Sequence, residues 1–160
     1  MMLPSHLVVA AAGFAVYVHT VTDGKFQWHL SLELVAGFFV VMLGAMLPDI
    51  DHPDSTVGKR VKWLSYPIRM VFGHRGITHS LFAVAAMCWC AYAAGNIWLS
   101  WLALGYLLHL VGDYLTDSGI PLLYPLSRKR YRFLITGTTN GLTEPIMVAL
   151  VVFGAAAYIF

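Results

Sequence analysis

The sequence predicts an all-α membrane protein, a polytopic bundle of about five helices with an additional interfacial amphipathic helix. Of its 160 residues, 59% are hydrophobic and only 11% are charged, whereas soluble domains carry about 25% charged residues. The mean hydropathy is +0.71. The apolar residues are gathered into separate stretches, and the chain has the length of a single domain. We therefore expect one membrane-embedded domain over residues 1–160.

Five apolar stretches of 16 to 19 residues account for the predicted helices: Leu7–Thr22, Leu30–Leu47, Ser80–Gly95, Ile97–Leu115 and Pro145–Phe160. A helix needs about 17–25 residues to cross the hydrocarbon layer. Because the stretches are near this lower limit, we expect the helices to be tilted little, or some of them to enter only one leaflet.

Helix starts are marked by residues that favour capping. Ser5 is predicted to cap the first helix, Thr78 the third and Thr143 the fifth. Glu144 and Pro145 fall in the first turn of the fifth helix, where a carboxylate suits the helix dipole and proline costs no hydrogen bond.

The connection Pro48–Ile77 contains the predicted amphipathic helix. Basic residues lie off its apolar stripe, as expected for a helix at the level of anionic headgroups. A helix that packs on its own bundle is an equal alternative. The stripe consists of Val57, Val61, Leu64, Ile68 and Val71, and the basic residues are Lys59, Arg60, Lys62 and Arg69.

Topology follows from the basic residues. With five spans, the long connections Pro48–Ile77 and Asp117–Leu142 share one side of the membrane, and they hold nine of the ten Lys and Arg residues. Only Lys25 falls on the other side. The positive-inside rule places both connections in the cytoplasm. Because topology explains the basic residues, we expect the lipid bilayer as a partner and no binding of nucleic acid.

Ionisable side chains gather at this same cytoplasmic face, because every predicted helix brings at least one. His19 and His29 lie at the opposite face, where we expect no special role. The predicted metal ligands are His6, Asp49, Asp51, His79, His109, Asp113 and Glu144, and the predicted catalytic residues are Asp51, Asp117, His74 and Arg75.

The spacing and chemistry of these residues favour a metal site. His109, Asp113 and Asp117 are four residues apart, so they share one helical face. Several carboxylates that converge beside an apolar layer repel one another and are costly to desolvate. A divalent cation removes that cost, and imidazole with carboxylate is a ligand set suited to zinc, with manganese or iron as alternatives. We expect one or two ions.

Each residue also has an ordinary interpretation. Asp51 would cap a turn before Pro53, and Asp117 would form a turn at the end of a helix. Arg75 would only add to the excess of basic residues on the cytoplasmic side. Three other functional classes remain: a metal transporter, a metal-free phosphatase with a His74 nucleophile, and a structural anchor. A transporter would place its ligands near mid-membrane on broken helices.

Four segments resemble the YdjM-like family, described as LexA-regulated, inner-membrane, metal-dependent hydrolases. The resemblance covers about half of the chain and implies a location in the bacterial inner membrane and metal-dependent hydrolysis. The segments are Leu47–Pro53, Gly73–Ser80, Gly105–Asp113 and Thr116–Pro125.

The order of ligand types also resembles that of zinc-dependent phospholipase C and P1-type nucleases. This looser similarity implies His6, Asp49 or Asp51, His79, His109, Asp113 and Glu144 as ligands. Because the site opens at the level of the headgroups, we expect hydrolysis of a phosphoester in a phospholipid or another amphipathic substrate. A divalent ion lowers the pKa of a bound water and polarises a phosphoryl oxygen. Asp51 or Asp117 is expected as general base, and Arg75 with the Arg128–Arg132 cluster as partners of the phosphate.

Overall fold

The computed structural model describes residues 1–22, 31–134, 136–139 and 141–160. These ranges contain six α-helices and two short 3-10 helices, and no extended strand is found in them. The predicted all-α class is therefore confirmed. Lys25 and His29 lie outside the described residues.

The five predicted apolar stretches correspond to five of the α-helices, with ends that shift by a few residues, and the remaining α-helix is the short amphipathic one. The elements in chain order are α1 (Leu3–Val21), α2 (Leu32–Gly44), η1 (Pro48–Asp51), α3 (Lys62–Phe72), η2 (Ile77–His79), α4 (Leu81–Ala94), α5 (Ile97–Tyr114) and α6 (Thr143–Ile159).

The three predicted caps are wrong, each by a few residues. The first helix begins before Ser5, because Pro4 is in its first turn and is already suited to the helical backbone. Ser80, rather than Thr78, caps α4, and Thr78 lies in η2. Thr143 is the first residue of α6 instead of its cap.

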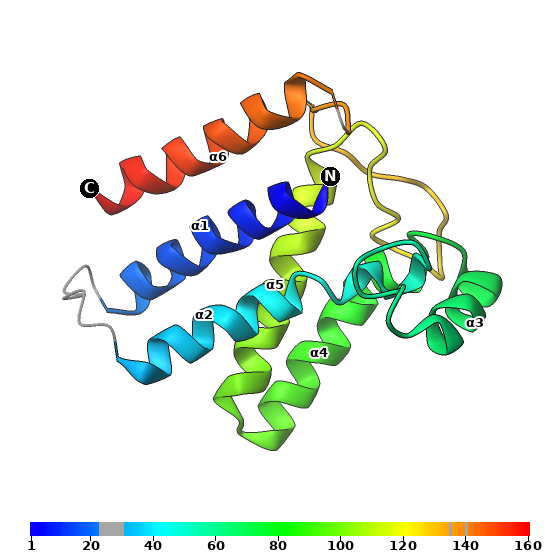
Figure 1. The fold of residues 1–160 in the computed structure, drawn as a ribbon, viewed down its shortest axis with the longest axis horizontal. Coiled ribbons are helices and arrows are strands. Elements are labelled where there is room, and N and C mark those ends of the chain that lie inside the picture. Colours follow the sequence, from blue (N-terminus) through cyan, green and yellow to red (C-terminus); the bar gives the residue numbers. More distant parts are fainter. Residues whose placement is uncertain (23–30, 135, 140) are drawn as a thin grey trace.

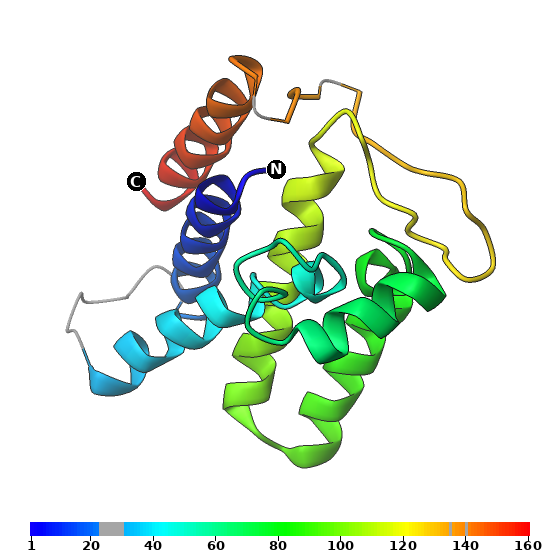
Figure 2. The same cartoon turned by 45° about the vertical axis from the view of Figure 1, so that its right-hand side comes forward.

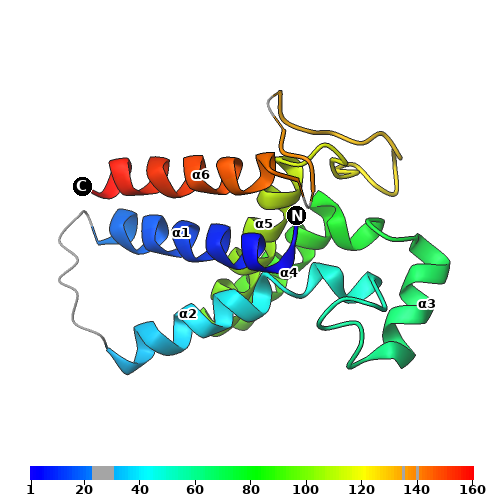
Figure 3. The same cartoon turned by 45° about the horizontal axis from the view of Figure 1, so that its top comes forward.

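The helices form a bundle in which α1 and α6 run side by side in the same direction, with α2 on the other side of α1 (Figures 1 and 3). The hairpin of α4 and α5 crosses this group obliquely, and α5 contacts both α1 and α2 (Figure 2). As a result, the first turns of α1 and α6, the end of α2 and the last turn of α5 meet at one end of the bundle.

Close packing of α2 against α5 depends on glycine. A Cβ atom at Gly105 would lie 2.0 Å from the carbonyl oxygen of Val41, and one at Gly44 would lie 2.2 Å from that of Leu102. Both obstacles are backbone atoms that cannot rotate away. The two helices can therefore approach this closely only with glycine at these positions.

The apolar core lies between α1, α2 and α5, away from the end where the helices meet. It consists of Ala10, Phe14, Val18, Val41, Ala45 and Trp101. Phe14 contacts Phe38 and Trp101 in edge-to-face arrangements, with ring centroids 5.9 and 6.4 Å apart. Such pairs add to the stabilisation that burial of apolar area provides.

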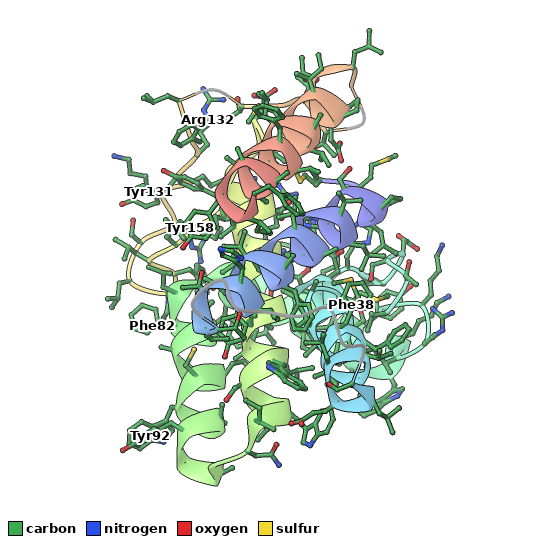
Figure 4. The ribbon with its side chains drawn as sticks, turned by 90° about the vertical axis from the view of Figure 1, so that its left-hand side faces the viewer. Phe38, Phe82, Tyr92, Tyr131, Arg132 and Tyr158 are labelled. Carbon is green, nitrogen blue, oxygen red and sulfur yellow. The ribbon has the colours of Figure 1, made fainter. Side chains whose placement is uncertain are left out.

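Much of the outer surface is apolar, as expected for contact with lipid. Figure 4 shows Phe82 and Tyr92 projecting outward from α4, and their exposed fractions are 46% and 82%. Within the described ranges, two segments are long and apolar enough to cross a membrane, Leu3–Val21 and Leu32–Asp51. At 14 residues, α4 extends only about 21 Å, less than the roughly 30 Å hydrocarbon layer. Five complete spans therefore stay a prediction.

The predicted amphipathic helix is present as α3, and it has two apolar faces. Leu64 and Ile68 of the predicted stripe are half-buried, and α3 contacts η1. The rest of the predicted stripe is wrong, because Val57 and Val61 precede the helix and Val71 is 69% exposed. A second stripe of Trp63, Tyr66 and Met70 has exposed fractions of 76%, 53% and 79%. The inner face thus packs on the protein, while the outer face has the aromatic composition of a membrane-interface segment.

Candidate metal centre

The meeting point of the helix ends is a buried cluster of ionisable side chains. Six of the seven predicted metal ligands are at most 3% exposed, namely His6, Asp51, His79, His109, Asp113 and Glu144. The seventh, Asp49, has 26% of its side chain exposed. The predicted convergence on one end of the bundle is thus present in the structure.

His6, His109 and Asp113 form the first group whose atoms could hold a metal ion, with one ligand atom of each within 4.8 Å of the others. The His6 and His109 rings stack with their centroids 3.8 Å apart. The Nε2 atom of His6 lies 3.4 Å from Oδ1 of Asp113. The first turn of α1 and the last turns of α5 provide this group.

Asp49, His79 and His109 form the second group, with the same limit of 4.8 Å. Nε2 of His109 lies 3.8 Å from Oδ1 of Asp49 and 3.8 Å from Oδ2 of Asp113. Nε2 of His79 lies 3.5 Å from Oδ2 of Asp113. Because the two groups share His109 and border on Asp113, they form one continuous centre.

Neighbouring groups orient the two central histidines. Nδ1 of His109 is 2.7 Å from the carbonyl oxygen of Ala45. A carbonyl only accepts, so Nδ1 carries the proton and Nε2 keeps its lone pair. Nδ1 of His79 lies 3.3 Å from Oδ2 of Asp51 and 3.0 Å from the Thr78 hydroxyl. A carboxylate behind a histidine is the usual support of a metal-binding imidazole.

The unpartnered atoms of the centre fit a metal ion. Nε2 of His79 and of His109 is buried and has no hydrogen-bond partner among the described residues, an arrangement that is costly without a ligand. Zinc ligands at 2.0–2.2 Å in tetrahedral geometry lie about 3.3–3.6 Å from one another. The separations of 3.5 to 3.8 Å between these nitrogens and the carboxylates, and of 3.4 Å between Nε2 of His6 and Asp113, are close to that range.

Asp113 connects the centre to cationic groups. Its Oδ1 accepts from NH2 of Arg75 at 2.8 Å and from the amino group of Met1 at 2.7 Å, while Oδ2 is turned to the two histidines. The backbone of Arg75 has a φ of 57°, which is unfavourable for a residue with a side chain. Holding Arg75 in this conformation directs its guanidinium to Asp113.

Asp51 has its oxygens engaged by neighbouring groups. Oδ1 lies 2.8 Å from Nδ1 of His74, and Oδ2 accepts from the Arg75 backbone N–H at 2.9 Å and from the Thr78 hydroxyl. These contacts leave Asp51 suited to orienting His74 and His79, and less suited to binding an ion directly or acting as general base.

Two other predicted residues lie away from the paired groups. The carboxylate of Asp117 accepts a hydrogen bond from the Thr136 hydroxyl and is part of the loop after α5. Glu144 accepts from the backbone N–H of Met2 at 2.7 Å and thereby joins the starts of α1 and α6. Neither belongs to the groups with metal-binding geometry.

The structure also adds residues that sequence reasoning missed. The Ala45 carbonyl has no signature in sequence, because any residue at the end of α2 would provide it. Tyr106 donates from its hydroxyl to the Thr78 carbonyl at 2.5 Å and so braces the segment that carries His79. In the sequence, the position of Tyr106 one turn before His109 was the signal that could have identified it.

A hollow of about 330 Å³ borders the centre and gives access to it. Its wall includes Asp49, His52, His74 and Arg75. His74 is 36% exposed, whereas Asp51 behind it is fully buried. A small substrate group could thus reach the margin of the centre beside a histidine that a carboxylate holds in place.

Comparison with known proteins supports membrane location. The family model described as "YdjM inner membrane protein" matches residues 1–160. The chain is similar to the Inner membrane protein YdjM of Escherichia coli (strain K12) and of Shigella flexneri. The identity to each is 44% over 133 aligned positions, and the match covers 78% of this chain and 64% of each relative. The match thus spans a little less than two thirds of these relatives.

A more distant similarity connects the chain to the Uncharacterized protein YvsG of Bacillus subtilis (strain 168). The identity is 32% over 120 residues, which are 74% of each chain. No solved structure matches the chain.

Proposed function

The chain belongs to the YdjM inner membrane protein family, and from this premise we propose that it is a membrane-bound metal-dependent hydrolase. Its substrate is a phosphoester of a phospholipid or of another amphipathic molecule at the cytoplasmic face. The observation that supports this proposal most is the pair of ligand groups that share His109, with unpartnered nitrogens on His79 and His109.

The residues that would hold the metal are His6, His79, His109, Asp49 and Asp113. Zinc is the favoured ion because the set mixes neutral imidazole with carboxylate, and manganese or iron are alternatives. One or two ions fit the overlapping groups. When bound, such an ion polarises a phosphoryl oxygen and makes water a stronger nucleophile at neutral pH.

His74 is the protein group best placed to move a proton. Asp51 holds its Nδ1 at 2.8 Å, which leaves Nε2 to take a proton from the attacking water and to return it to the leaving group. This pairing of an exposed histidine with a buried aspartate is the orienting arrangement that general bases use in hydrolases. Asp51 is then a positioning residue rather than the base.

Arg75 would steady the negative charge of the phosphoryl group. It lines the hollow beside Asp49 and His74, and its guanidinium is anchored by Asp113. An anchored guanidinium offers fixed donors to phosphate oxygens and loses little entropy on binding.

The proposed orientation in the membrane is multi-pass, with the centre on the cytoplasmic side. The basic residues of the two long connections support this orientation. The exposed Trp63, Tyr66 and Met70 of α3 support a position of the centre at the level of the headgroups. A substrate phosphoester in a headgroup would then reach the centre without leaving the bilayer.

Metal analysis of the purified protein by ICP-MS, combined with a phospholipid hydrolysis assay in nanodiscs, tests the proposal. We expect at least one bound divalent ion per chain, and loss of both metal and hydrolysis in His109→Ala and Asp113→Ala. His19→Ala is the matched control, because His19 lies at the other end of α1. Metal-free wild-type protein with unchanged thermal stability under EDTA would refute the proposal.

A non-catalytic metal-binding protein or transporter is the second candidate, and burial of the centre favours it. His79 and His109 are 0% exposed and Asp113 is 1% exposed, so an ion could be held without contact with substrate. Uptake of metal into proteoliposomes, without hydrolysis of any lipid, would support this alternative.

A further inference from the structure

A second hollow of about 320 Å³ lies on the other side of His74 and Arg75. Its wall comes from the segment Val71–Gly76 and from four residues of the long connection after α5, namely Pro121, Tyr124, Arg128 and Arg130. His74 and Arg75 also line the hollow beside Asp49. The two hollows therefore share a common wall.

The charge of this second hollow is uniformly positive. Arg75, Arg128 and Arg130 line it together with His74, and no carboxylate is among the described residues that line it. In the described part of the chain, neither Arg128 nor Arg130 forms an ion pair, and Arg130 has only a weak contact of 3.4 Å to the Ser118 carbonyl. Asp113 compensates the charge of Arg75 alone, so Arg128 and Arg130 remain uncompensated cations at this hollow, and an anion between them would relieve their repulsion.

Arg75 adds a separate indication of a ligand. Two of its nitrogens are engaged, one by Ser118 and one by Asp113. Its Nε is buried and has no hydrogen-bond partner among the described residues. An N–H of a charged group that is withdrawn from water in this way is costly until an acceptor binds.

The loop that carries the arginines is held in place by backbone hydrogen bonds. Ile120 and Tyr131 exchange a pair of them at 2.9 Å each, which closes the loop 121–130. Leu81, at the start of α4, donates to the Leu122 carbonyl at 2.9 Å and ties the loop to the segment that follows His79. The arginines are therefore presented on a closed loop beside the centre.

We propose that this second hollow is a subsite for a dianionic phosphate group other than the one that is cleaved. The inference rests on the proposed function, and it narrows the substrate class to amphipathic molecules with two anionic groups, such as a diphosphate or a phosphorylated headgroup. One phosphate lies beside Asp49 and the other beside Arg128 and Arg130, with Arg75 in the wall between the two hollows. Guanidinium groups bind phosphate oxygens in pairs of parallel hydrogen bonds.

The margin of the subsite suits the apolar part of such a substrate. Val71 and Phe72 at the end of α3 line the hollow, and their exposed fractions are 69% and 38%. The same helix presents Trp63, Tyr66 and Met70 outward. An acyl or prenyl chain could therefore remain in the bilayer beside α3 while the charged groups occupy the hollows.

Calorimetric titration of the purified protein in phosphatidylcholine nanodiscs tests the subsite. One arm adds inorganic phosphate, and the other compares nanodiscs with and without phosphatidic acid, so that a free phosphate and a lipid headgroup are distinguished. The variant Arg128→Gln/Arg130→Gln should weaken binding about tenfold or more, because it removes two of the three guanidinium groups that line the hollow.

Lys129→Gln is the matched control, since Lys129 lies between the two arginines and does not line the hollow. It contacts the Tyr131 ring instead, with its Nζ 5.6 Å from the ring centroid. Figure 4 labels Tyr131 and its neighbour Arg132, which directly follow the loop 121–130 in the chain. We expect less than a twofold change for Lys129→Gln. Equal weakening by the control, or wild-type binding by the double variant, would overturn the proposal.

A third variant separates this inference from the proposed function. His109→Ala should lose the metal but keep phosphate binding that depends on Arg128 and Arg130. If the wild type binds metal and hydrolyses lipid while the arginine variants bind phosphate normally, the subsite is refuted and the hydrolase stands. If phosphate binding depends on the arginines but no metal is found, the hydrolase is refuted and the subsite stands.

Discussion

The same helices enclose two halves of the bundle interior, an apolar half and a polar half, and these are chemically opposite. In one half, Phe14 of α1, Val41 of α2 and Trp101 of α5 form a purely apolar core. In the other half, His6 of α1 and His109 of α5 are equally buried beside Asp113. Only two turns of α5 separate Trp101 from His109.

The difference shows that burial has two separate energetic consequences in this protein. The apolar half is complete as it stands, because its stability comes from removal of apolar area from water and from close packing. The polar half is incomplete, because Nε2 of His79 and Nε2 of His109 have no partner among the described residues. We infer that the apolar half carries the fold and that the polar half depends on a ligand.

Removal of metal should give the largest effect, and it should act only through the polar half. A ligand present at a thousandfold excess over its Kd stabilises the native state by about 4 kcal/mol. We therefore expect EDTA to lower the unfolding temperature of the wild-type protein in detergent, as measured by differential scanning fluorimetry. His109→Ala should unfold at the same temperature with and without EDTA, and a similar drop in that variant would contradict our comparison.

A change in the apolar half should destabilise the fold without altering the chemistry of the centre. Gly37→Ala places a Cβ atom 2.3 Å from the buried Trp101 ring, so α2 or that ring must shift. Overpacking of this kind costs about 1–3 kcal/mol. We expect a lower unfolding temperature, with an unchanged metal content per folded chain by ICP-MS.

Gly154→Ala is the matched control for this prediction, because no atom of the described residues lies within 4 Å of a Cβ atom at that position. It should leave the unfolding temperature unchanged or slightly raised. Loss of metal in folded Gly37→Ala protein would show that the two halves are not separate.

The smallest expected effect concerns a residue that supports the polar half from outside. Asp51→Asn keeps the shape of the side chain but removes the charge behind His79 and His74. Loss of such a support lowers metal affinity about 10–100-fold, which is about 1.4–2.8 kcal/mol. Competition with a chelator of known zinc affinity measures this change. At saturating zinc, Asp51→Asn should still bind as much metal as the wild type.

If Asp51 were itself a ligand, Asp51→Asn would cost far more than this range. Asp117→Asn provides the comparison on the other side, because the Asp117 carboxylate is engaged by Thr136 in a loop. We expect wild-type metal affinity for Asp117→Asn. A loss of affinity equal to that of Asp51→Asn would show that Asp117 belongs to the centre.

Sequence reasoning located the helices well because their signal is local. The apolar stretch Ile97–Leu115 became α5 at Ile97–Tyr114, since a long apolar run bounded by Asn96 admits few alternatives. Helix starts were predicted poorly, as Ser5 and Thr78 show. A capping residue competes with its neighbours for the same N–H groups, and tertiary contacts such as that of Thr78 with Asp51 decide the outcome.

The same limit applies within the centre. The spacing of His109 and Asp113 was enough to place both on one face of a helix, and the structure brings His6 and His79 to that face. Sequence could not distinguish Asp49 from Asp51, because two carboxylates one residue apart are equivalent until the backbone is folded. In η1, Asp51 is turned to His74 and Arg75, while Asp49 faces His109.

The sequence by itself determined the helical class, the apolar surface and the set of residues at one end of the bundle, because hydropathy and helical periodicity act over a few residues. Tertiary structure alone decided which histidine nitrogens are unpartnered, which carboxylate supports and which faces the centre, and that three arginines border one hollow. Those properties depend on the relative positions of α1, α5, η1 and the loops, which are distant in the chain and meet only when the bundle has formed.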